Sequence, residues 1–245
     1  MPDTKPLAED PQAYQAKEAS AGSHAPRINA LRAAVLGAND GIVSTAGILT
    51  GVAGATMEFA ALLTAGVAGV TAGALSMAVG EYVSVSAQRD SESALLAKER
   101  RELEEMPEEE LAELTSLYVD KGLTPELAAQ VARQLHDHDA LAAHAEAELG
   151  IDPNELANPT HAAISSALAF AAGSMLPLAA MLLAPTASKL YVTIAAVVAA
   201  LTLTGYFGAR WGGTPVGKSM ARNVVGGLVA MGVTFWIGRL VGLAL

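Results

Sequence analysis

Residues 90–113 read DSESALLAKERRELEEMPEEELAE and belong to an acidic region that interrupts long apolar segments. Across residues 90–160 the chain carries 18 Asp and Glu against 5 Lys and Arg. The segments on both sides of this region are apolar runs rich in Gly, Ala and Ser. A carboxylate-rich region between membrane-spanning segments indicates that the protein handles cations at a membrane surface.

The apolar segments are long enough to cross a lipid bilayer. The chain is 52% hydrophobic and has a mean hydropathy of +0.36. A bilayer core of about 30 Å requires about 20 apolar residues per helix. The first candidate contains Arg32 and Asp40, which make it the least apolar of the set. The predicted spans are 28–57, 59–88, 162–188, 190–209 and 223–245.

The distribution of Lys and Arg predicts the orientation of these five spans. With the N-terminus in the cytosol, the inside segments hold 13 Lys and Arg, and the outside segments hold only Lys189 and Arg239. Cytosolic loops carry the excess of basic residues in membrane proteins. We therefore expect an integral membrane protein with a cytosolic N-terminus, a cytosolic acidic region and an outward-facing C-terminus.

The fold class that follows is all-α, with five transmembrane helices and a cytosolic three-helix acidic domain between spans 2 and 3. Residues 59–106 contain no proline, so one helix can continue from the second span into the domain. Pro107 and Thr124-Pro125 predict helix starts, Gly122 and Gly150 predict ends, and Asn158-Pro159 predicts a cap for the third span. The predicted domains are 1–26 as a disordered cytosolic tail, 27–89 as spans 1–2, 90–160 as the acidic domain and 161–245 as spans 3–5.

The absence of cysteine excludes disulfides, thiolate metal sites and iron–sulfur ligation. Any metal ligands are therefore carboxylate, imidazole or thioether groups. Residues 1–26 lack the basic start and apolar core of a signal peptide.

Two stretches of this sequence resemble the vacuolar iron transporter family. The first is Gly-Ala-Asn-Asp-Gly-Ile-Val-Ser-Thr at 37–45, and the second is Gly-Ala-Leu-Ser-Met-Ala-Val-Gly-Glu-Tyr-Val-Ser-Val-Ser at 73–86, followed by Gln88-Arg89-Asp90. Glu-Leu-Gly-Ile at 148–151 also fits, and the resemblance covers residues 27–245. It implies a five-span homodimer of the bacterial type, in a bacterial cell membrane, that exports Fe²⁺ and also Mn²⁺ from the cytosol in exchange for protons.

The resemblance places a transport pathway at Asp40 and Met77. A carboxylate within a membrane span costs roughly 2.5–3.5 kcal/mol on insertion scales and is functional by default. The alternative role for Asp40 is a structural ion pair with Arg32. Asn39 offers a neighbouring carbonyl ligand, and the Met77 thioether is a soft ligand that disfavours Mg²⁺ and Ca²⁺. Glu81 lies four residues after Met77 as a gate, a proton site or a partner of Arg89.

The acidic domain supplies the second predicted site. Pairs of glutamates three residues apart lie on both sides of Pro107, and the resemblance implies four metal-binding glutamates at this spacing. It also implies a methionine near position 144, where this chain has a histidine that suits Fe²⁺, Mn²⁺ and Zn²⁺. His136 and His138 are interpreted as solvated. The predicted metal ligands are Glu99, Glu102, Glu110, Glu113, His144 and Glu148.

These features favour a divalent metal exporter that works by proton antiport and is not an enzyme. The alternatives are a membrane-anchored carboxylate ferroxidase and a metal sensor that does not transport. We expect no permanent cofactor, and Fe²⁺, Mn²⁺, Zn²⁺ or Co²⁺ bound as substrate. The expected partners are these cations, protons, the lipid bilayer and a second copy of the chain, without nucleic acid.

Overall fold

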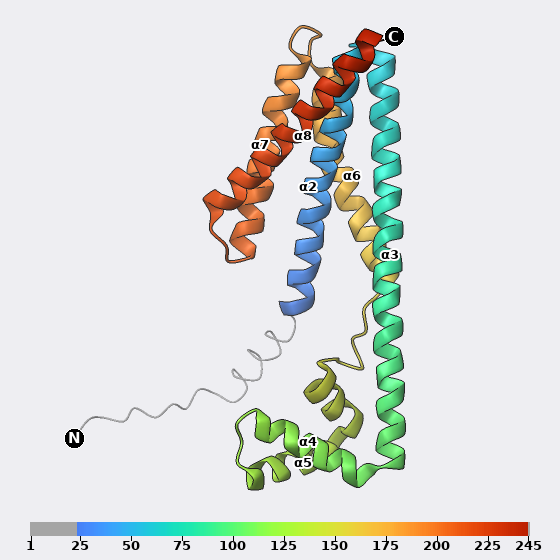
Figure 1. Cartoon of the computed structure of the whole chain (residues 1–245), viewed down its shortest axis with the longest axis vertical. Coiled ribbons are helices and arrows are strands. Elements are labelled where there is room, and N and C mark those ends of the chain that lie inside the picture. The colour runs from blue at the N-terminus through green and yellow to red at the C-terminus, as the bar shows by residue number, and fades with distance from the viewer. Residues whose placement is uncertain (1–23, 245) are drawn as a thin grey trace, which may run out of the picture. The chain divides into compact units, whose positions relative to one another are not determined.

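The computed structural model describes residues 24–244, and in this part of the chain the protein is helical without strands (Figure 1). The predicted tail, 1–26, lies outside the described residues except for 24–26, which belong to the first described helix. The elements are α2 (His24–Ala55), α3 (Phe59–Glu105), α4 (Pro107–Asp120), α5 (Pro125–His144), the π-helical turn η1 (Ala145–Leu149), α6 (Pro159–Leu183), α7 (Lys189–Trp211) and α8 (Val216–Ala244).

Five of these helices are long and apolar enough to cross a membrane, as the sequence predicts. They are α2 (over Ala34–Ala55), α3, α6, α7 and α8. The third span ends at Leu183 rather than at residue 188, because Pro185 follows and cannot continue the helix ladder. The last begins at Val216 rather than at 223, directly after Pro215. At 47 residues, α3 is about 70 Å long, more than twice the thickness of a bilayer core.

The helices form two compact units that divide within α3. One unit holds the described residues up to Val79 together with residues 163–244, and the other is Gly80–Ala162. The second unit begins ten residues before the acidic region that the charge pattern delimits.

In the first unit, α2 packs against α8 through small residues. A side chain at Gly238 would overlap the backbone oxygen of Gly51, so the two helices approach at their backbones. Beside this contact, the hydroxyls of Thr50 and Thr234 lie 3.1 Å apart. Hydroxyl hydrogen bonds and close backbone contact hold helices together where lipid supplies no hydrophobic driving force.

The glycines of the 37–45 stretch hold α2 against α6. A Cβ on Gly41 would overlap the carbonyl oxygen of Phe170, and one on Gly37 would come within 3.0 Å of Ala169. The Ser174 hydroxyl donates to the Gly41 carbonyl oxygen at 3.2 Å. This stretch therefore uses its glycine face for packing.

In the second unit, the local signals in the sequence are confirmed as helix boundaries. Pro107 occupies the first turn of α4, and Gly122 follows this helix with a φ of 103°. Thr124 caps α5 by accepting the Leu127 N–H at 3.4 Å, and Asn158 caps α6 by accepting the His161 N–H at 3.1 Å.

The predicted helix after Thr124 is interrupted. Asp139 leaves helical geometry, with a φ of −157° and a ψ of 95°, and its carboxylate accepts the Ala142 N–H at 3.0 Å. The residues after Asp139 therefore form a short helix with its own N-cap. A π-helical turn follows, and Gly150 ends it with a φ of 66°.

Candidate functional site

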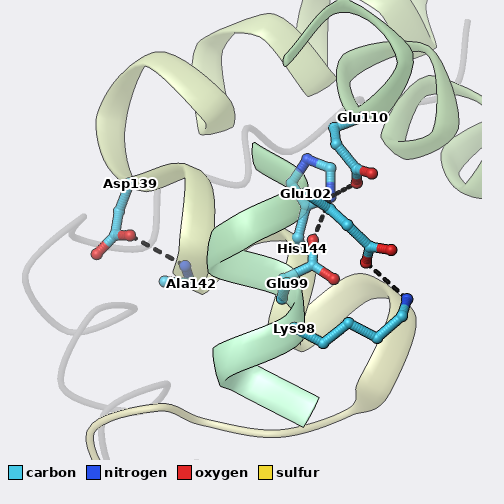
Figure 2. Close-up of polar contacts among 7 residues, drawn as sticks. All are labelled: Lys98, Glu99, Glu102, Glu110, Asp139, Ala142 and His144. Carbon is cyan, nitrogen blue, oxygen red and sulfur yellow. Dashed lines mark hydrogen bonds and ion pairs between the residues drawn. The ribbon is translucent and has the colours of Figure 1, made fainter. Parts of the chain in front are cut away.

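A buried histidine lies at the centre of the carboxylates of the second unit (Figure 2). His144, at the end of α5, has no exposed surface. Its Nδ1 lies 3.1 Å from an oxygen of Glu99 on α3 and 3.5 Å from an oxygen of Glu110 on α4. Three helices that follow one another along the chain thus meet at one imidazole.

The local sequence explains why these side chains point inward. Glu99 follows the buried Leu96 by three residues, and Glu110 precedes the buried Leu114 by four. Residues three and four apart share a helix face. Each glutamate therefore lies on the apolar face that its helix packs into the unit.

The spacing of the ligand atoms suits a single cation. Glu99, His144 and Glu148 each offer one ligand atom, and these atoms lie within 4.8 Å of one another. Donors bound about 2.1 Å from a common metal ion are separated by about 3–4 Å. His144 Nδ1 and Glu99 Oε1 lie 3.1 Å apart, close enough for both atoms to bind the same metal ion.

Two predicted ligands are less buried than Glu99 and Glu110. Glu102 is half-buried and accepts a charge-assisted hydrogen bond from Lys98 at 2.6 Å. This contact is the first cause of a raised pKa of the Lys98 ammonium. Glu113 is exposed on α4. The structure therefore gathers four of the six predicted side chains around one point: Glu99, Glu110, His144 and Glu148.

The surroundings of Glu99, Glu110 and His144 oppose the charged forms of these side chains. Burial, followed by the charges of Glu148 and Glu110, raises the pKa of Glu99 to about 7. Burial and Glu113 raise the pKa of Glu110. Burial, and then His136, lower the pKa of His144. A divalent cation would reverse the balance at the carboxylates, because opposite charge favours their ionised form.

The first unit contains a separate cavity of about 510 Å³. Asn39 and Asp40 line it from α2, and Met77 lines it from α3. The Asn39 side-chain oxygen accepts a hydrogen bond from Thr204 on α7 at 3.3 Å. Asp40 follows directly, and its side chain is exposed. Three of the four predicted pathway residues thus share one cavity.

Glu81, the fourth, is half-buried on α3 in the second unit. Among the described side chains, no ion pair joins it to Arg89. The alternative pairing of Asp40 with Arg32 involves a side chain outside those that the structure describes.

Two residues with possible functional roles were missed by the sequence reasoning. Arg222 of α8 lines the cavity with Asp40, whereas its charge was used only to predict orientation. The small and polar residues at 222, 223, 226 and 227, which recur at helical spacing, could have indicated a cavity face. His136 lies beside His144, with ring centres 5.8 Å apart. No signal indicated this contact, because a straight helix would separate the two by about 12 Å.

An all-α architecture with five apolar helices and an intervening acidic unit defines an integral membrane protein with a candidate metal centre. The model of the VIT family matches residues 31–239. The chain belongs to this family, as its motifs indicate.

Curated relatives agree with this assignment. The vacuolar iron transporter of Acanthamoeba castellanii is 44% identical over 86% of this chain and 78% of its own. Vacuolar iron transporter homolog 2 of Arabidopsis thaliana is 34% identical over 93% of this chain and 92% of its own. Vacuolar iron transporter homolog 5 of Oryza sativa subsp. japonica is 38% identical over 88% and 82%.

Proposed function

We propose that this protein transports divalent metal ions, Fe²⁺ and also Mn²⁺, out of the cytosol in exchange for protons. The observation that carries the proposal is the cavity of the membrane unit, which Asp40, Asn39 and Met77 line together. Intramembrane carboxylates mark ion pathways and proton relays. The names of the relatives, which describe iron transporters, support the same substrate.

Asp40 is the residue that binds either the metal or the proton. Its carboxylate attracts a divalent cation when ionised and releases the cation when protonated. Met77 adds a thioether, which tolerates Fe²⁺ and disfavours Mg²⁺ and Ca²⁺. Thr204 holds the Asn39 amide in place, and this fixed oxygen is a third donor.

The acidic unit captures the cation on the cytosolic side. Its orientation follows from the 13 basic residues on one side of the membrane against 2 on the other. Glu99, Glu110, His144 and Glu148 form the binding cluster. The raised pKa values of Glu99 and Glu110 make metal binding release protons, as expected when protonated ligands bind metal.

The transporter works as a homodimer. In the single chain, Asp40 is exposed and its neighbour Leu36 is 63% exposed. A carboxylate that faces lipid is costly, so charged side chains in spans face a protein interior or a water-filled cavity. A second copy that covers this face of α2 would remove Asp40 from lipid.

Metal flux into sealed proteoliposomes tests the function directly. We expect Fe²⁺ and Mn²⁺ to move in the export direction, with an opposite change of internal pH. Zn²⁺ and Co²⁺ measured in parallel would rank the substrates. Metal-dependent oxygen consumption without flux would support a ferroxidase instead, and binding without flux or oxygen consumption would support a sensor.

Orientation has its own test. The chain has no cysteine, so a single cysteine reports one position. Asp120→Cys is preferable to a cysteine at Gly122, because Gly122 has a positive φ that strains other residues. Asp120 is exposed in the acidic unit. We expect an impermeant thiol reagent to label Asp120→Cys only after lysis, and labelling of intact cells would contradict the cytosolic placement.

A further inference from the structure

Two buried ring nitrogens in the acidic unit lack a partner among the described residues. They are Nε2 of His144 and Nδ1 of His136. His144 Nδ1 faces Glu99 and Glu110, whereas its other nitrogen points away from both carboxylates (Figure 2). Buried polar atoms in folded proteins normally have partners, so an unpartnered group on two adjacent rings requires an explanation.

The break at Asp139 is what brings the two histidines together. Eight residues of continuous helix would separate their backbones by about 12 Å. Because Asp139 interrupts α5 and caps the following segment, the rings instead lie 5.8 Å apart at an interplanar angle of 70°.

This separation suits two imidazoles that bind one ion. A zinc–nitrogen bond is about 2.0–2.1 Å long, so the ring centre lies about 3.2 Å from the metal. Two rings on one ion are then at most about 6.4 Å apart, and about 5.2 Å at the tetrahedral angle. The observed 5.8 Å falls between these limits.

We propose that His136 and His144 form a second cation position, which takes a borderline divalent ion such as Zn²⁺ or Co²⁺ between the two rings. Imidazole nitrogens suit such ions, whereas carboxylates suit Mn²⁺ and Mg²⁺. Water completes the coordination. The inference rests on the proposed function, because it names the class of cation that the acidic unit selects.

The two cation positions share the His144 ring. A neutral imidazole has one lone pair for a metal, because its other nitrogen carries a proton. His144 therefore serves either the carboxylate position, with Glu99 and Glu148, or the imidazole position, with His136. When zinc occupies the imidazole position, His144 is no longer available as a metal ligand at the carboxylate position. Mn²⁺ binding at the carboxylate position is then weaker.

The test compares His136→Gln with His138→Gln in the full-length chain in detergent. His138 is exposed on the same helix and serves as the matched control. We expect His136→Gln to weaken zinc binding about 10–100-fold, and Mn²⁺ binding less than threefold. We expect His138→Gln to change neither. Unchanged zinc affinity in His136→Gln, or equal losses for both metals, would overturn the proposal.

A measurement on the unaltered chain needs no variant to fold. X-ray absorption at the zinc edge, with one equivalent of zinc, counts the imidazoles bound to the metal. Two imidazoles support the proposal, and one or none overturns it. Metal flux is measured separately in proteoliposomes, so loss of the transport function leaves this result intact.

Discussion

The membrane cavity and the buried cluster both present carboxylates to a cation, but they are assembled in opposite ways. Asp40 is exposed in a cavity that shares it with the cationic Arg222 and the neutral donors Asn39 and Met77. Glu99 and Glu110 are buried, at 3% and 5% exposure, around an uncharged imidazole.

The comparison suggests that the buried cluster retains a bound cation, whereas the membrane cavity lets the cation pass. A buried cluster with several carboxylates holds a cation through many contacts and repels its own charges when empty. A single exposed carboxylate, in a cavity that Arg222 also lines, releases a cation more readily. Removing the membrane carboxylate should therefore stop movement, and removing a cluster carboxylate should weaken capture.

The largest expected effect comes from Asp40→Asn, which keeps the shape of the side chain and removes its charge. We expect flux to fall about 10- to 150-fold, because a charged interaction is worth about 1.5–3 kcal/mol and no other carboxylate among the described residues lines this cavity. Zinc binding to the acidic unit should be unchanged. Flux within a factor of two of wild type would assign Asp40 a structural role.

Glu99→Gln should act on the other region. The metal affinity of the full-length chain should fall about 10–100-fold, since the variant removes a buried charged ligand. Flux should fall but persist at saturating metal. Titration calorimetry of the wild type and the variant measures the difference, and an unaltered affinity would leave the cluster without a role in capture.

The same variant tests the electrostatics of the empty cluster. The pKa of Glu99 is raised from 4.5 to about 7, so its ionisation lowers folding stability as pH rises between these values. With metal chelated, the free energy of unfolding of Glu99→Gln should therefore exceed that of wild type by about 1–3 kcal/mol at pH 8. This difference should disappear below pH 4.5. A thermal unfolding series over this pH range measures it.

Met77→Ala should have a smaller effect on flux than Asp40→Asn. It removes a neutral, soft donor and leaves the carboxylate in place. We expect a severalfold loss with Fe²⁺ and a smaller loss with Mn²⁺, which gains less from a thioether. Equal losses for the two metals in parallel flux assays would indicate that Met77 only shapes the cavity.

The smallest effect is expected for Glu113→Gln. Glu113 contributes to the raised pKa of Glu110, but it is exposed, so solvent screens its charge. Metal affinity should stay within about threefold of wild type. A loss as large as that of Glu99→Gln would mean that Glu113 turns inward when metal binds.

Local patterns in the sequence predicted most of the fold and part of each site. Apolar length located the five spans, and proline, glycine and capping residues located the boundaries of α4 and α5. These signals depend on backbone chemistry within a few residues. Helix faces on both sides of Pro107 predicted that Glu99 and Glu110 approach each other, and the family resemblance implied that position 144 joins them.

What the sequence did not reveal depends on contacts between distant segments. Glu102 and Glu113 have the same spacing in the sequence as Glu99 and Glu110. The structure buries Glu99 and Glu110 but leaves Glu102 half-buried and Glu113 exposed. Glu102 forms an ion pair with Lys98. The break at Asp139 also escaped notice, because aspartate within a polar helical run is common and its capping role appears only in three dimensions.

The π-helical turn at Ala145–Leu149 makes the geometry of the cluster depend on how many residues separate its ligands. A π-turn accommodates an extra residue within a helical run, and such turns occur frequently at functional sites. Removing one alanine between His144 and Glu148 would permit an ordinary helix, in which the two side chains would be three residues apart rather than four. Such a deletion would leave every ligand present in the sequence and still change the distance between the two. The site therefore depends on the number of residues between His144 and Glu148 as well as on their identity.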